Sequence, residues 1–133
     1  MSGIVQFGTK SSTSNYWQEL APIVASIGRW ILNLDNGICQ IDETLRDLIG
    51  WNDVDLKFPA IKFLKQIHPN DLPIVLSAMQ ATINTGDLLK THFRFVRFDG
   101  SIVWLDGRGA IVDYEDGCRY LTGVNFDVSE YKF

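Results

Sequence analysis

The sequence predicts one domain of the α+β class, a five-stranded antiparallel sheet with helices packed on one face. Two short stretches with the alternation and composition of strands, residues 29–34 and 38–41, come before a helical region. Three longer strand-like stretches follow that region, at residues 89–98, 102–112 and 118–128. Strands that flank a block of helices are typical of α+β domains. A chain of 133 residues is long enough for one hydrophobic core of this kind.

Composition excludes several classes of protein. Hydrophobic residues make up 46% and charged residues 21%, as in folded globular domains rather than disordered chains. With 12 basic and 16 acidic residues, the net charge of −4 provides no positive field for nucleic acid or an anionic membrane. The N-terminal residues lack a signal-peptide pattern, and no apolar run reaches the ~18 residues of a membrane span. We therefore expect a cytoplasmic segment without membrane contact, and leave the membrane association of a longer parent protein open.

Cysteine usage gives no sign of a disulfide framework or a metal site. Cys39 and Cys118 are the two cysteines, and neither belongs to a Cys-x-x-Cys pair or has a nearby histidine. Both lie in predicted strands, where cysteine commonly serves as a small buried hydrophobic residue. The sequence therefore predicts no metal centre.

The N-terminal part predicts a flexible lead-in followed by a flanking helix. Residues 1–14 end in a run of small polar residues, so we expect them to be flexible. In residues 15–27 apolar side chains recur at three- and four-residue spacings, as on one face of a helix: Trp17, Leu20, Ile23, Val24 and Ile27. Gly28 ends this helix, and Pro22 predicts a kink within it.

Local signals then define a hairpin and two short helices. The first two strands are joined by residues 35–37, an Asp-Asn-Gly sequence that favours a tight turn. Asp42 is placed to cap a helical turn that Gly50 ends. Residues 51–59 show no periodicity and are expected to be irregular, and residues 61–67 are expected to form a short helix.

The clearest helix follows the His-Pro-Asn-Asp sequence at residues 68–71 and ends at Gly86. Its expected buried stripe consists of Ile74, Val75, Ala78, Met79, Thr82 and Ile83. Turn sequences at residues 99–100 and 116–117 then join the last three strands into a meander.

Alternation assigns the side chains of the last three strands to two faces of the sheet. One face carries Phe93, Phe95, Val103, Leu105, Gly107, Leu121, Gly123 and Asn125. The other carries Trp104, Tyr120, Thr122, Val124, Phe126 and Val128, and is too apolar to stand in water. We expect the N-terminal helix to cover this second face through Trp17, Leu20 and Val24.

This order of elements, read with particular residues, resembles the PAS domain family and, within it, the PAS-fold subclass of bacterial sensor proteins. The landmarks that carry the resemblance are residues 28–34, 48–50, 68–71, 93–94, 99–101, Trp104 and residues 121–130. The resemblance implies a PAS domain over residues 28–133. Within the family, the flavin-binding LOV branch has its cavity between the helices and the face that here contains Phe93 and Leu105.

The resemblance implies a sensory module in signal transduction and not an enzyme. Such a module binds a small molecule in its cavity, relays a conformational signal to a C-terminal output domain, or does both. The output is a histidine kinase or a GGDEF/EAL cyclic-di-GMP enzyme. Asp127, Ser129 and Glu130 look like the family's junction to that domain, which implies a piece of a longer protein. The alternative is a ligand-free dimerisation or relay module whose large inward side chains fill the cavity.

The resemblance also implies a set of pocket residues. They are Trp30, Leu32, Ile67, Met79, Phe93, Phe95, Leu105, Leu121 and Asn125. Asn125 matches the position where LOV domains carry a glutamine that contacts flavin. A polar side chain facing an apolar cavity needs a partner, because an unpaired buried amide costs roughly 1–3 kcal/mol. That partner is either a ligand or water, or a neighbouring group of the protein.

Oligomeric state and cofactors follow from the same resemblance. Many PAS domains dimerise through an N-terminal helix and the outer sheet face, which implies a homodimer through Trp17, Leu20, Val24, Trp104, Tyr120 and Val124. Packing of the helix within one chain is the alternative. No cofactor is expected: the Asn-Cys-Arg-Phe motif of LOV photochemistry is absent, and the subclass has the His68 turn with or without haem. Flavin and haem remain alternatives.

Overall fold

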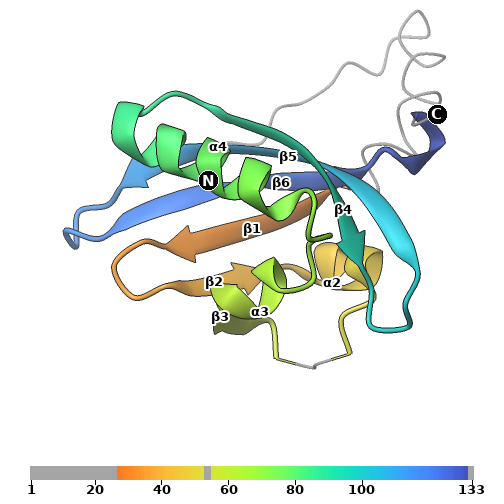
Figure 1. Cartoon of the computed structure of the whole chain (residues 1–133). Helices are drawn as coiled ribbons and strands as arrows, with labels where there is room; N and C mark the ends of the chain where they lie inside the picture. The colour runs from red at the N-terminus through yellow and green to blue at the C-terminus, as the bar shows by residue number, and fades with distance from the viewer. Residues whose placement is uncertain (1–26, 53–54, 132–133) are drawn as a thin grey trace, which may run out of the picture.

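The structure, a computed structural model, describes residues 27–52 and 55–131 of the chain. Within these residues six antiparallel strands form one sheet in the order β3-β2-β1-β6-β5-β4, accompanied by three α-helices (Figure 1). In chain order the elements are β1 (Gly28–Asn33), β2 (Ile38–Ile41), α2 (Glu43–Ile49), β3 (Lys57–Pro59), α3 (Ala60–Leu64), α4 (Leu72–Thr85), β4 (Leu89–Val96), β5 (Ile102–Asp113), β6 (Arg119–Asp127) and the 3-10 helix η1 (Ser129–Tyr131). The predicted α+β class is confirmed.

The expected lead-in and flanking helix, residues 1–14 and 15–27, lie outside the described residues apart from Ile27. Ile27 directly precedes β1. Among the described residues, no helix has the length and apolar character needed to cross a membrane.

The sixth strand, β3, corrects the prediction of five strands. Residues 51–59 were expected to be irregular, but Lys57–Pro59 pairs with β2 in the register Cys39↔Phe58. Phe58 is buried, and its ring packs 4.6 Å from that of Trp51, centroid to centroid. A strand of three residues is too short to show alternation, and the proline that ends it is tolerated because β3 lies at an edge of the sheet.

Helix α2 forms as its capping residues predict. The Asp42 carboxylate accepts a hydrogen bond of 2.8 Å from the Leu45 N–H, and Gly50 ends the helix with a φ of +63°. Leu45 and Ile49 are fully buried on the side that faces the sheet. The local signals therefore place a firmly packed helix beside β1.

The two later helices depart from the prediction in detail. α3 ends at Leu64, and beyond it Ile67 forms an isolated bridge with Phe95 of β4 rather than continuing the expected helix. In α4, Ile74 is 65% exposed although it was expected in the buried stripe, whereas Val75 is 4% exposed. Successive residues of a helix point about 100° apart, so a single sheet edge under α4 buries Val75 and leaves its neighbour in solvent.

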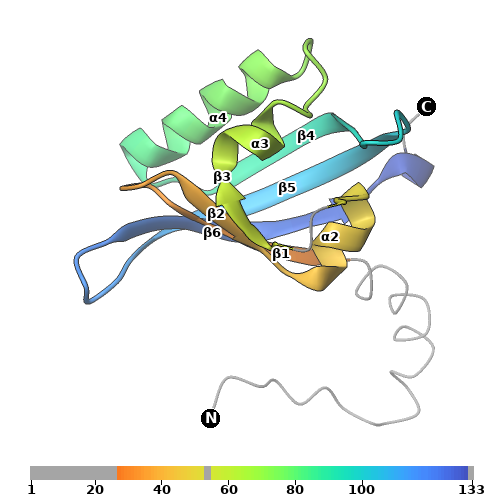
Figure 2. The ribbon, with the colours of Figure 1, turned by 90° about the horizontal axis from the view of Figure 1, so that it is seen from below.

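Figure 2 shows α3 and α4 on the same side of the sheet. The largest fully buried side chains lie on this side of the sheet, and they are Leu45, Ile49, Phe95, Val103, Leu105 and Leu121. The face that alternation assigned to Phe93 and Asn125 therefore meets the helices. The core lies between the two layers, and this is also where a site can be enclosed.

Candidate functional site

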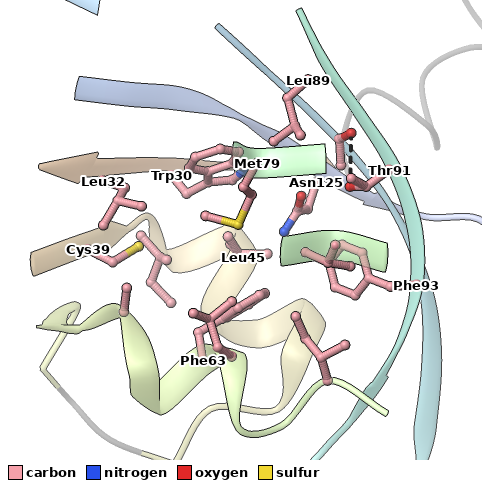
Figure 3. Close-up of a pocket in the computed structure, with 16 residues that line it drawn as sticks. Trp30, Leu32, Cys39, Leu45, Phe63, Met79, Leu89, Thr91, Phe93 and Asn125 are labelled. Carbon is pink, nitrogen blue, oxygen red and sulfur yellow. Dashed lines mark hydrogen bonds between the residues drawn. The ribbon is translucent and has the colours of Figure 1, made fainter. Parts of the chain in front are cut away.

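An apolar cavity of about 70 Å³ lies between the sheet and the helices (Figure 3). Strands β1, β2, β4, β5 and β6 and helices α2, α3 and α4 all contribute to its wall, and none of the described residues that line it is charged. A cavity of ~150 Å³ holds a benzene molecule. A ligand that enters without displacing side chains is therefore limited to a few non-hydrogen atoms.

The structure brings together most of the pocket residues expected from the sequence. Those that line the cavity are Trp30, Leu32, Ile67, Met79, Phe93 and Asn125. Phe95, Leu105 and Leu121 do not line it, although each is fully buried. The space beside the inward-facing Phe95 is filled by protein, because the centroid of its ring lies 4.8 Å from that of the Phe63 ring.

Sequence reasoning missed several lining residues. They are Cys39, Ile41, Leu45, Ala60, Phe63, Leu64, Val75, Leu89 and Thr91, whereas Gly107 lines the cavity from the face to which alternation assigned it. Alternation within β4 places Thr91 on the same face as Phe93, and that signal was available. The helical residues gave no such signal, because the side of a short helix that meets a cavity depends on how the helix docks.

Asn125 is the most distinctive polar residue of the cavity. It is 4% exposed, and its side chain makes no hydrogen bond with another described residue. Figure 3 shows the amide nitrogen turned into the cavity. A Cβ at position 107 would lie only 3.0 Å from Asn125 Oδ1, so glycine there leaves room for the amide. The described part of the protein thus offers this amide no partner of its own.

Two further polar residues lie in the wall. Thr91 Oγ1 donates a hydrogen bond of 3.3 Å to the carbonyl of Gly107, so its hydrogen is already used. The Nε1–H of Trp30 is buried and has no acceptor among the described residues. Its ring packs against β5, where a Cβ at Gly109 would lie 3.0 Å from the ring. Among the described residues, Asn125 therefore carries the uncommitted donor that faces the cavity, whereas protein atoms cover the Trp30 nitrogen.

Cys39 lies in the cavity wall, and burial raises the pKa of its thiol to about 12. At pH 8 this reduces the thiolate fraction about 1,000-fold relative to an unperturbed thiol, and the thiolate is the reactive form. In a Cys118→Ser variant, we expect Ellman's reagent to label Cys39 about 1,000-fold more slowly in the native protein than in urea. Rapid labelling of the native protein would contradict this burial.

The expected signal junction is tied to the sheet. Asp127 Oδ1 accepts a hydrogen bond of 2.8 Å from the Ser129 N–H, and Ser129 Oγ accepts one of 3.0 Å from the Trp104 N–H. The Val128 N–H donates to the Trp104 carbonyl at 2.9 Å. Glu130 is exposed within η1. The end of β6 is therefore coupled to β5.

On the outer sheet face, Trp104, Tyr120 and Val124 are half-buried. The guanidinium of Arg94 lies 5.2 Å from the centre of the Trp104 ring, and the Tyr120 ring lies 4.7 Å from that of Tyr114. The helix residues expected to join this face, Trp17, Leu20 and Val24, lie outside the described residues.

An acid on this outer face was not anticipated from the sequence. Asp106 is 3% exposed and accepts a hydrogen bond of 2.7 Å from Arg108 Nε. His92 Nε2 lies 2.6 Å from its other oxygen. Hydrogen bonds from Arg108 and His92 lower the pKa of Asp106 in spite of its burial, which acts in the opposite direction. The carboxylate is therefore satisfied within the sheet.

The residues weighed as metal or haem ligands do not form a site. His68 lies outside the cavity wall, in the turn before α4, where its Nδ1 accepts a hydrogen bond of 3.1 Å from the Asn70 N–H. Across residues 27–52 and 55–131, no three His, Cys, Asp or Glu side chains are grouped to hold a metal ion.

Comparison with known proteins identifies the family. Residues 38–125 match the sequence model of the PAS fold. No curated protein sequence matches this chain significantly. A sensory box histidine kinase/response regulator from Burkholderia thailandensis superposes with a TM-score of 0.70 at 21% identity, covering 88% of this chain and 86% of that one.

Two further solved structures share the fold. The N-terminal domain of a diguanylate cyclase with a PAS/PAC sensor from Marinobacter aquaeolei has a TM-score of 0.70 at 22% identity, covering 79% of this chain and 97% of its own. A PAS domain from Colwellia psychrerythraea has a TM-score of 0.64 at 16% identity, covering 88% of this chain and 98% of its own. The family match over residues 38–125 and the shared architecture agree, and the chain belongs to the PAS domain family.

Proposed function

We propose that this chain is a sensory module that binds a small molecule in its cavity and relays the change to a C-terminal output domain. The observation that carries the proposal is the apolar cavity between the sheet and the helices, into which Asn125 turns an amide that has no partner among the described residues. Domains of the same fold occur in a histidine kinase and a diguanylate cyclase. We therefore propose a kinase or a GGDEF/EAL enzyme as the class of output.

Strand β6 offers a direct route from the cavity to the junction. Asn125 pairs with Gly28 of β1 on one side and Gly107 of β5 on the other, and Asp127 follows two residues later on the same strand. A ligand that forms a hydrogen bond with the Asn125 amide therefore acts on β6, the strand that ends at the junction. Such a ligand changes the output only to the extent that it binds two states of the domain with different affinities.

The proposal includes a homodimer formed through the outer sheet face and residues 15–27. Its support is the apolar composition of that face, where Trp104, Tyr120 and Val124 stand beside further large side chains. A dimer interface at this face lies close to the junction at Ser129, which bonds to Trp104.

A ligand-free relay or dimerisation module is the second candidate. The small size of the cavity, about 70 Å³, favours it. Trp30, Met79 and Phe93 are large side chains that line the cavity. In this case the domain would pass on a signal that arrives from elsewhere in a longer protein.

Native mass spectrometry of the purified chain tests the two candidates together. We expect a dimer with a mass excess that is lost on denaturation. A Cys39→Leu substitution adds carbon atoms to the cavity wall and is expected to abolish the excess, whereas Cys118→Leu, outside the cavity, is expected to keep it.

A wild-type dimer without added mass would support the ligand-free candidate against the sensory proposal. A mass excess that Cys39→Leu retains would place the ligand elsewhere and contradict the cavity as its site. A monomer at micromolar concentration would contradict the homodimer.

A further inference from the structure

From the cavity wall we infer the chemical class of the ligand: a small, uncharged carbonyl compound with about four non-hydrogen atoms, held by a hydrogen bond from Asn125 Nδ2. This inference rests on the proposed function, because it concerns the same cavity.

The first step is to establish whether the missing hydrogen-bond partner is a donor or an acceptor. Asn125 Nδ2 is a donor, whereas the hydrogen of Thr91 Oγ1 is already given to the Gly107 carbonyl. Asn125 Oδ1 lies on the Gly107 side, and the nitrogen is turned to the cavity. What the wall lacks is therefore an acceptor, and a carbonyl oxygen is a strong acceptor that carries no hydrogen of its own.

The second step is the availability of the donor. The Trp30 Nε1–H is also unpaired among the described residues, but protein atoms cover its nitrogen and leave it no exposed surface. Asn125 is therefore the donor that a small molecule in the cavity meets.

The third step is charge and size. None of the lining residues in the part of the chain that the structure describes is charged, so an ionised ligand would lose its hydration without gaining a counterion there. The volume of about 70 Å³ is near half of the ~150 Å³ that accommodates the six carbons of benzene. The remaining wall is apolar, which suits methyl or methylene groups. A ketone or aldehyde of about four non-hydrogen atoms meets all of these conditions.

A set of four molecules with equal numbers of non-hydrogen atoms tests the class. Acetone supplies the acceptor, isobutene is its apolar isostere, acetate is anionic, and isopropylammonium is cationic. The methyl group of Met79 lines the cavity, and Met1 is the chain's other methionine, so ¹³C-methyl NMR provides a local reporter and an internal reference. Xenon, which enters apolar cavities, reports whether the cavity is accessible at all.

We expect acetone to shift the Met79 methyl signal and to bind at least about 10-fold more tightly than acetate or isopropylammonium. The Asn125→Leu substitution is expected to lower the ratio of acetone affinity to isobutene affinity by about 10-fold, since one hydrogen bond is lost. The matched control Asn84→Leu leaves this ratio unchanged, because Asn84 is exposed on α4 and does not line the cavity.

The outcomes separate this inference from the function on which it rests. If xenon does not shift the Met79 signal, the cavity is closed and the sensory proposal fails together with the ligand class. If xenon shifts it but the acetone-to-isobutene ratio is the same in wild type and Asn125→Leu, the ligand class is wrong and the sensory proposal stands. Preferential binding of either ion also overturns the class.

Discussion

Replacing Gly123 with alanine is expected to destabilise the domain by about 4 kcal/mol or more, a large share of the stability of a domain of this size. A Cβ at this position would overlap the carbonyl oxygen of Arg108 and lie 2.8 Å from the Cα of Gly109, both on β5. These are backbone atoms in the centre of the sheet, where β5 and β6 pair in register. Relief therefore requires the two strands to separate, and no change of side-chain rotamer provides it.

Chemical denaturation followed by circular dichroism measures this effect. Gly37→Ala is the matched control, because a Cβ there meets nothing within 4 Å and only the φ of +74° is unfavourable for alanine. That strain costs about 1 kcal/mol. Equal denaturation midpoints for the two variants would show that β5 and β6 have room at Gly123.

The close approach at Gly123 shows one limit of prediction from the sequence. Alternation predicts which face of β6 the residue occupies, and the turn at residues 116–117 predicts its partner strand. The sequence does not report how near the backbone of β5 comes, because this distance depends on the twist and packing of the whole sheet.

The cavity shows a second limit, for a similar physical reason. Alternation identified the inward residues of β4 and β6, including Phe93 and Asn125, because period two is a local property of a strand. It could not tell Phe93, which lines the cavity, from Phe95, whose inward space is filled by Phe63 of α3. Whether an inward side chain meets a void or a helix is decided by the docking of α3.

The turn before α4 contains a local sequence signal that predicts the correct element, although its aspartate does not make the capping contact typical of that signal. A His-Pro-Asn-Asp sequence predicts the start of a helix, and α4 begins at Leu72 as expected. However, the Asp71 carboxylate does not cap that helix. It accepts hydrogen bonds from the backbone N–H, Nε and Nη2 of Arg94, at 2.8, 2.9 and 2.7 Å. Because Asp71 and Arg94 are 23 residues apart in the chain, no local sequence pattern predicts their contact.

These three bonds make Asp71→Ala the second substitution with a large expected effect, about 3 kcal/mol of lost stability. Asp71 joins the start of α4 to β4, and its side chain is only 13% exposed. Its removal leaves the Arg94 guanidinium over the Trp104 ring without a carboxylate and the Arg94 N–H without an acceptor. The matched control is Asp113→Ala, since Asp113 pairs with Arg119 at 3.3 Å but is 73% exposed. We expect the control to cost at most about 0.5 kcal/mol.

The same pair predicts how stability depends on pH. Hydrogen bonds from Arg94 lower the pKa of Asp71 from 3.8 to about 2 in the folded domain. A carboxyl whose pKa is lower in the folded state than in the unfolded state stabilises the fold above the unfolded value, and this contribution is lost as the pH falls. Wild type should therefore lose stability between pH 4 and pH 2 more steeply than Asp71→Ala. Urea titrations at intervals across this range measure the difference. Parallel profiles for wild type and Asp71→Ala would mean that the carboxylate and guanidinium do not hold α4 to β4 in solution.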